Sequence, residues 1–204
     1  MPRPGVREPL LDAAERLFGE HGIPTVSDRQ VAEAAHSSNH SAVHYYFGGR
    51  TGLLQALLDR HHEAVEPGQR RMFEESDSLL GDVRALVIPL TDVLAELPAP
   101  SWRARFLRQA LLDPGTAELL REGSRWSGTS ARIVASAAER LSDLDPAIVE
   151  ARTRLVVYVV ATACAEYEER VQRSGEPPRW ADTGAFLCDA IAGLLQAPIS
   201  RVPG

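Results

Sequence analysis

The sequence predicts an all-α protein of about nine helices, and three observations support this fold class. Apolar residues recur at intervals of three or four positions in nearly every segment, which is the helical period. The sequence has no alternating strand pattern, no internal repeat and no low-complexity segment. A content of 44% hydrophobic and 25% charged residues in a chain of 204 is typical of a globular protein with a substantial core.

The first two helices are marked by their ends. An apolar stripe with helical spacing runs from Leu10 to Phe18, and Gly22 supplies a stop. Ser27, followed by Gln30 three residues later, forms a capping box, because the two side chains can satisfy free amides at a helix start. A short helix over 28–35 is therefore expected, with its apolar side facing inward.

A second short helix is expected over 39–46, inside the polar and aromatic stretch NHSAVHYYFGGR. Ser38 or Asn39 can cap its start, and Gly48–Gly49 ends it. The expected domain boundary follows this glycine pair, which divides the chain into residues 1–49 and residues 50–204.

Longer helices are expected after the glycine pair. One begins near Arg50, and Pro67–Gly68 marks its end or a bend in it. His61 and His62, late in this helix, are expected at the surface. The next helix, from Asp77 to Leu97, carries nine aliphatic residues and no charge at the inward spacing, and Pro89 should kink it.

The rest of the chain continues the helical pattern. Trp102, Phe106 and Ala110 recur at helical spacing and are expected to face the core, while Arg105 and Arg108 face water.

Aspartate–proline pairs open two further helices. Asp113–Pro114 and Asp145–Pro146 both indicate an N-cap followed by proline at the first helical position. They predict helices over about 114–141 and 146–173, and a last helix is expected over about 182–196.

Two short helices joined by small polar residues, with longer helices before and after, form the pattern of a helix-turn-helix. The second helix of such a unit lies in the major groove of DNA with its N-terminal residues against base edges. Val43 and Phe47, four apart, are the expected core anchors. Tyr45, Tyr46 and Arg50 follow, where hydroxyl and guanidinium groups can reach phosphate. The residues left facing outward are Asn39, His40, Ser41 and His44.

The run from Leu10 to His61 resembles the N-terminal domain of TetR-family transcriptional repressors. The matching pieces are LLDAAERLFGEHG, TVSDRQVAEAA, AVHYYFGGR and LLQALL. Two features depart from the family's pattern. Many members have glycine in the turn where this chain has His36–Ser37, and the turn AHSSN is one residue longer than the commonest form. Histidine tolerates a left-handed backbone better than most residues but less well than glycine.

The resemblance implies a double-stranded DNA operator as partner and a set of contact residues around the motif. Ser27 is first a helix cap, and Arg29 has the alternative of a solvated charge. Ala42 has two roles open to it, contact with a thymine methyl or simple close approach. Tyr46 has the alternative of packing against the first helix. The expected contacts are Ser27, Arg29, Asn39, His40, Ser41, Ala42, His44, Tyr45, Tyr46 and Arg50.

The resemblance also implies a homodimer and a small-molecule effector that releases the operator. The two terminal helices would pair with their symmetry mates, and the apolar residues expected in that interface are Val156, Val160, Phe186, Ile191 and Leu194. The effector would enter the core of the second domain. Its candidate wall residues, each with the alternative of plain core packing, are Trp102, Phe106, Trp126 and Tyr158. The aliphatic lining predicts a mostly apolar effector.

Charge and composition set further limits. The net charge of −6 argues against a protein that coats nucleic acid non-specifically. Residues 1–65 carry six arginines and eight acidic residues, and they contain all six histidines, whose protonation would make this region less negative.

Several other functions are not expected. His36, His40 and His44 are four apart, but no cysteine or carboxylate lies near in sequence to complete a site, so neither a metal nor a cofactor is expected. No signal peptide is apparent, and the longest apolar run, over 155–165, is about half the roughly 20 residues of a membrane span, so a cytoplasmic protein without a membrane partner is expected. The alternative function is an all-α small-molecule carrier or enzyme with a purely structural helix-turn-helix, although no nucleophile–base pair is present in the sequence pattern.

Overall fold

A computed structural model of the chain describes residues 5–116, 119 and 128–199. Over these residues it contains nine α-helices and one short 3-10 turn, and no strand, which confirms the all-α prediction. None of the helices in this described part is both long and apolar enough to cross a membrane. Trp126, one of the candidate effector contacts, lies outside the described residues.

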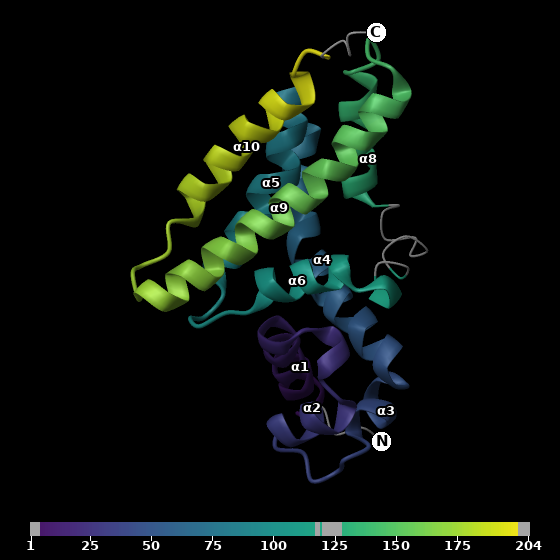
Figure 1. Ribbon diagram of the computed structural model, residues 1–204, viewed down its shortest axis with the longest axis vertical. Coiled ribbons are helices and arrows are strands. Elements are labelled where there is room, and N and C mark those ends of the chain that lie inside the picture. Colours follow the sequence, from purple (N-terminus) through teal and green to yellow (C-terminus); the bar gives the residue numbers. More distant parts are fainter. Residues whose placement is uncertain (1–4, 117–118, 120–127, 200–204) are drawn as a thin grey trace, which may run out of the picture.

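The N-terminal head is a compact group of short helices at the lower end of the molecule in Figure 1. Its elements are α1 (Arg7–His21), the 3-10 turn η1 (Ile23–Thr25), α2 (Asp28–Ala34) and α3 (Ala42–Phe47). The predicted capping box is present at the start of α2, since the Ser27 hydroxyl accepts from the Gln30 amide while the Gln30 side chain accepts from the Ser27 amide. Gly22, which ends α1, has a φ of 84°, a backbone conformation that favours glycine.

Helix α4 (Arg50–Glu74) runs from the head into the rest of the molecule without ending at Pro67–Gly68. Of the two alternatives predicted for Pro67–Gly68, an end of the helix is wrong, while a bend stays a prediction. The packing explains the glycine. A methyl group on Gly68 would lie 2.8 Å from Cβ of Pro89 in α5 (Leu79–Glu96), so these two helices cross at the smallest residue available.

The body comprises α5, α8 (Thr129–Glu139), α9 (Pro146–Ser174) and α10 (Trp180–Gln196), with α6 (Arg103–Leu112) lying between the body and the head (Figure 1). Asp145 caps α9 as predicted, with its Oδ1 accepting from the Ala147 amide at 2.8 Å. Of the helix expected over 114–141, the structure describes residues 114–116 and 119 and the part from residue 128 onward, which contains α8.

The buried apolar residues of the described part form two clusters. The first joins α1, α2 and α3 to the first half of α4, and it also includes Phe106 and Ala110 of α6. The second joins α5, α9 and α10 to the N-terminal end of α6. Helix α6 therefore contributes to both, and the head's core extends past residue 49 into α4.

Two predictions about buried charge were wrong. Arg105 was expected to face water, but only 8% of it is exposed. The helix from Asp77 to Leu97 was expected to bury no charge, but Asp82 is completely buried. Asp82 is neutralised there, because its Oδ2 accepts from Arg140 Nε at 2.9 Å and from the Ser136 hydroxyl at 2.8 Å.

Candidate nucleic-acid interface

The turn between α2 and α3 is shaped by His36. Its φ is 54°, in the left-handed region, so this histidine has a backbone conformation that favours glycine. The His36 amide donates to the Glu33 carbonyl at 3.0 Å, and the Ser37 amide donates to the Ala32 carbonyl at 2.9 Å. These two bonds make the Schellman termination of a helix, which satisfies two carbonyls that α2 leaves free.

Helix α3 begins at Ala42, three residues later than predicted. Asn39 does not cap it. Instead, Asn39 Oδ1 accepts from the Ser41 amide at 2.9 Å, and the Ser37 hydroxyl accepts from the Asn39 amide at 3.2 Å. Such local bonds between side chain and backbone compete with helix formation. Asn39, His40 and Ser41 therefore lie in the turn that leads into α3 rather than in its first turn, and the N-cap Ser41 makes no capping hydrogen bond through its side chain.

The two sides of α3 differ in burial. Ala42 and Val43 are 0% and 1% exposed and pack into the head core. Ala42 was among the expected DNA contacts, but its burial leaves it the role of a small packing residue. Tyr46 is partly buried against the same core, while Tyr45 is 56% exposed and packs edge-on against the Tyr46 ring.

The exposed surface around α3 carries polar side chains whose charges largely cancel. Arg29 Nε donates to Glu33 Oε1 at 2.8 Å, and His40 Nδ1 lies 3.9 Å from the same oxygen. The hydrogen bond from Arg29 holds the pKa of the Glu33 carboxyl below its ordinary value. Asn39, Ser41 and His44 are also exposed. This surface offers many hydrogen-bonding groups and little net charge.

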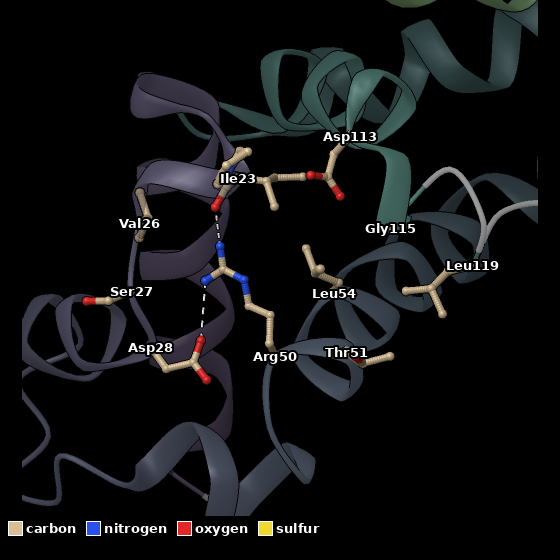
Figure 2. Close-up of a pocket in the computed structure, with 11 residues that line it drawn as sticks. Ile23, Val26, Ser27, Asp28, Arg50, Thr51, Leu54, Asp113, Gly115 and Leu119 are labelled. Carbon is tan, nitrogen blue, oxygen red and sulfur yellow. Dashed lines mark hydrogen bonds and ion pairs between the residues drawn. The ribbon is translucent and has the colours of Figure 1, made fainter.

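Arg50 is directed toward Ile23 and Asp28, as Figure 2 shows. Its Nη1 lies 3.2 Å from Asp28 Oδ1, its Nη2 donates to the Ile23 carbonyl, and its guanidinium stacks over the Phe18 ring at 4.4 Å from the centroid. The side chain is 28% exposed. Arg50 thus ties the start of α4 to the start of α2.

A cleft of about 590 Å³ lies beside Arg50, between the head and the segment after α6 (Figure 2). Its lining is mixed in character, since it includes the aliphatic residues Ile23, Val26 and Leu54 as well as the charged residues Asp28, Arg50 and Asp113. Asp113 Oδ2 accepts from the Thr116 amide and hydroxyl at 2.9 and 2.8 Å, which fits its predicted role as a cap.

Gly52 is a residue of this region that the sequence pattern did not single out. A methyl group there would lie 1.8 Å from the carbonyl oxygen of Phe47, the last residue of α3. No side chain fits in that space, so Gly52 allows α3 to end directly against the first turn of α4. A glycine in the first turn of an otherwise amphipathic helix was the available signal.

Of the three described candidates for effector contact, two lie on α6 and the third lies on α9. Phe106 is 0% exposed and lies in the head cluster, with its ring centroid 6.3 Å from that of Phe18. Trp102 is the N-cap residue of α6, under the Arg105 guanidinium at 5.9 Å. Tyr158 is 41% exposed on α9. Trp102 and Phe106 are thus one turn apart on α6, where the Phe106 amide donates to the Trp102 carbonyl at 2.8 Å, and both lie beside α1, whereas Tyr158 lies on α9.

The residues predicted to lie in the dimer interface differ in their exposure to solvent. Val156 and Ile191 are 4% and 1% exposed and belong to the body's own core, whereas Phe186 is 70% exposed. Val160 and Leu194 are partly buried against the body cluster. The exposed apolar residues of α9 are Leu155 at 49% and Tyr158 at 41%, which the sequence pattern did not assign to an interface.

Comparison with known proteins gives consistent results. Residues 10–57 match the family model of bacterial regulatory proteins of the tetR family. The HTH-type transcriptional regulator BetI of Burkholderia mallei (strain NCTC 10229) is 33% identical over 134 residues, which cover 61% of this chain and 67% of that protein. An uncharacterized HTH-type transcriptional regulator of Mycobacterium tuberculosis (strain CDC 1551 / Oshkosh) is 30% identical over 156 residues, covering 75% of this chain and 71% of that protein.

Solved structures extend the likeness over nearly the whole fold. The fatty acid degradation regulator FadR from Bacillus halodurans superposes with a TM-score of 0.65 over 96% of this chain and 99% of that one, at 15% identity. The ketosteroid transcriptional regulator KstR2 of Mycobacterium tuberculosis gives a TM-score of 0.61 over 94% and 95%, at 14% identity. The chain has a helix-turn-helix head, matches the family model over residues 10–57 and covers 67% and 71% of relatives that are 33% and 30% identical to it. It therefore belongs to the TetR family of DNA-binding transcriptional regulators.

Proposed function

We propose that the protein is a repressor that binds a pseudo-palindromic operator as a homodimer in the cytoplasm and is released by a small effector. The observation that carries this proposal is the pairing of two surfaces. One is the polar surface around α3, and the other is formed by the exposed apolar side chains on α9 and α10, which are Leu155, Tyr158 and Phe186. The first fits the grooves of DNA, and the second fits a second copy of the chain.

The proposed base-reading residues are the exposed ones at the α3 entrance: Asn39, His40, Ser41 and His44. Tyr45 and Arg29 are exposed nearby, and we propose that both contact phosphate. Ser27 serves first as the cap of α2, so a phosphate contact from its hydroxyl would share an atom with the capping box. Tyr46 contributes mainly by holding Tyr45 in place.

Arg50 reaches phosphate only if it exchanges Asp28 for the DNA backbone. Asp28→Asn would weaken its present ion pair, and we expect that variant to bind DNA more tightly than the wild type. Arg50→Ala should lower the slope of log affinity against log salt by about one if the exchange takes place. An unchanged slope would restrict Arg50 to holding the head together.

A gel shift with DNA from the protein's own promoter region tests the proposal as a whole. We expect a single retarded species whose footprint contains two half-sites related by a two-fold axis and separated by a whole number of helical turns or close to it. Protection of one unpaired half-site by a monomer would contradict the proposal. A wild-type protein that binds small apolar molecules and no duplex would favour the alternative function, an all-α small-molecule carrier.

We propose that residues 1–49 form the DNA-binding unit and that residues 50–204 respond to the effector. The effector would be uncharged and mostly apolar, because the buried charges Asp82, Arg105 and Arg103 already have partners inside the protein. Trp102 Nε1 and His61 Nδ1 are shielded from solvent and have no hydrogen-bond partner among the described residues, so they offer polar handles to a ligand.

A thermal-shift screen with matched neutral and charged compounds, followed by release from DNA, tests the nature of the effector. We expect neutral compounds with one hydrogen-bonding group to raise the melting temperature and to release the duplex. If only polyanionic compounds stabilise and release the protein, the proposal of an apolar effector is wrong.

A further inference from the structure

Helix α6 lies between the head and helix α9 and carries two buried arginines (Figure 1). Arg103 and Arg105 are 5% and 8% exposed. Two positions along a helix correspond to about 200° of rotation, so the two side chains leave α6 on opposite sides. One is therefore directed toward the head and the other toward α9, and each finds a carboxylate there.

On the head side, Arg103 Nε donates to Glu15 Oε2 of α1. The two side chains are 6% and 11% exposed. The same Glu15 oxygen accepts from Arg60 Nη2 of α4 at 2.7 Å. One buried carboxylate therefore joins α1, α4 and α6, the three helices that meet where the head ends.

On the α9 side, the partner is Glu168, which is 4% exposed. Its Oε2 accepts from Arg105 Nε and from the Arg105 amide, both at 3.1 Å. Its Oε1 accepts from the Ala104 amide at 3.2 Å and from the Ser101 hydroxyl at 2.6 Å. The first amides of a helix have no partner within the helix, so a carboxylate of α9 completes the start of α6.

A series of directional contacts thus runs from the head through α6 to α9. Apolar packing is non-directional and lets two surfaces slide, whereas hydrogen-bonded ion pairs that are shielded from water fix both distance and orientation. Close backbone packing supports the same junction, since a methyl group on Gly19 of α1 would lie 3.1 Å from the Trp102 carbonyl oxygen.

We infer that the ion pairs Arg103–Glu15 and Arg105–Glu168 hold each head at a fixed angle to α9 and thereby set the half-site spacing that the dimer accepts. The inference rests on the proposed function, in which α9 lies at the two-fold axis and the two heads read one operator. Glu15 and Glu168 are positioning residues in this arrangement, because neither lies on the exposed surface around α3.

The test uses full-length dimer and a duplex selected from a random library by the wild-type protein. The two half-sites of that duplex are kept, and base pairs are added or removed between them. Each added pair rotates one half-site by about 35° around the helix axis, so the wild type should lose about tenfold or more in affinity. Glu15→Gln and Glu168→Gln should bind the altered duplexes with a loss of less than about threefold relative to their own best spacing.

The control is Asp12→Asn. Asp12 lies on the same helix as Glu15 and pairs with the same Arg60, at 2.6 Å, but its side chain is 72% exposed. Exposed pairs contribute little, so we expect its spacing profile to match that of the wild type.

A second variant guards against loss of folding. Removing one partner of a buried pair leaves an uncompensated charge, whereas replacing both partners by apolar residues is often neutral for stability. The double variant Glu15→Met with Arg103→Met removes the directional bond, and Arg60, the other partner of Glu15, keeps its ion pair with Asp12 at 2.6 Å. It should show the same broadened spacing profile, with helix content unchanged by circular dichroism.

The experiment distinguishes failure of this inference from failure of the proposed function. If the charge-removing variants and the double variant lose affinity by the same factor at every spacing, the ion pairs have only a structural role and the inference is wrong. If the wild type selects no duplex from the library, the proposed function itself fails before the spacing series begins.

Discussion

The head and the outer side of α9 and α10 are built in opposite ways. The head hides its apolar side chains, with Phe18 and Val43 almost completely buried, and exposes histidines, serine and a tyrosine hydroxyl around α3. Helices α9 and α10 leave Leu155, Tyr158 and Phe186 exposed. A surface of polar groups can exchange hydrogen bonds with base edges and phosphate, whereas an apolar surface gains only by excluding water. The difference indicates two kinds of partner on one chain.

The largest expected effect comes from placing a charge on the apolar surface. Phe186→Glu should disrupt the dimer, because a buried carboxylate without a partner is costly. Two tethered heads bind more tightly than one, so we expect operator affinity to fall by about 10²- to 10⁴-fold. Sedimentation equilibrium would report the mass, and a gel shift would report the affinity.

Phe186→Leu is the matched control, since it keeps an apolar group at the same place and should remain dimeric. A Phe186→Glu protein that stays dimeric and binds its operator as the wild type does would show that the partner of this surface is not a second copy.

The next largest effect is expected within the head. Gly52→Ala would place a methyl group 1.8 Å from the Phe47 carbonyl oxygen, so α3 must shift against α4. Overpacking of this kind costs about 1–3 kcal/mol, and more when the neighbour is backbone. Urea unfolding should show the loss of stability, and DNA affinity should fall because the groove-facing residues move with α3. Thr51→Ala, at the exposed position just before, should change neither measurement. A Gly52→Ala protein as stable as the wild type would contradict the close contact.

His61 lies in α4 and is expected to make the stability of the protein sensitive to acid. The sequence pattern placed it at the surface, but its Nδ1 is shielded and the pKa of its imidazole is lowered to about 3, first by burial and then by Arg103 and His62. The unfolded chain binds a proton at higher pH than the folded one, so stability is lost as the pH falls below the ordinary histidine value of about 6.5. This residue should contribute a loss of about 1.4 kcal/mol between pH 7.5 and 5.5.

The measurement compares urea unfolding at the two pH values for the wild type and for His61→Gln. The variant should lose less stability on acidification by about that amount. His21→Gln, an exposed histidine of the head, should behave as the wild type does. An equal acid loss in wild type and His61→Gln would show that His61 is accessible to protons in the folded state.

Much of the fold was predictable, because helix ends are local. The capping box at Ser27 and the aspartate–proline start of α9 depend on residues a few positions apart, and both are as predicted. The start of α3 was missed for a local reason too, since Asn39 bonds to the backbone instead of capping a helix.

Burial between helices was less predictable, because it depends on neighbours far away in sequence. Arg105 became buried through Glu168, which lies 63 residues later in the chain. Val156 and Ile191 have the apolar character of interface residues, but the packing of α9 and α10 on the body covers them and leaves Phe186 exposed. Apolar periodicity shows that a helix has an inward side, but it does not show which apolar residues face the protein's own core and which face a partner.

The smallest expected effect concerns the turn between α2 and α3. His36 holds a left-handed backbone, which costs a residue with a side chain about 1–2 kcal/mol, while glycine loses about 0.5–1 kcal/mol through its greater freedom in the unfolded chain. His36→Gly should therefore stabilise the protein by about 0.5 kcal/mol, measured by urea unfolding. His36→Ala keeps the strained backbone and should give no such gain. Equal gains in both variants would assign the effect to the imidazole rather than to the backbone. If His36→Gly also leaves operator preference unchanged, His36 shapes the turn and the reading of bases falls to the exposed residues that follow it.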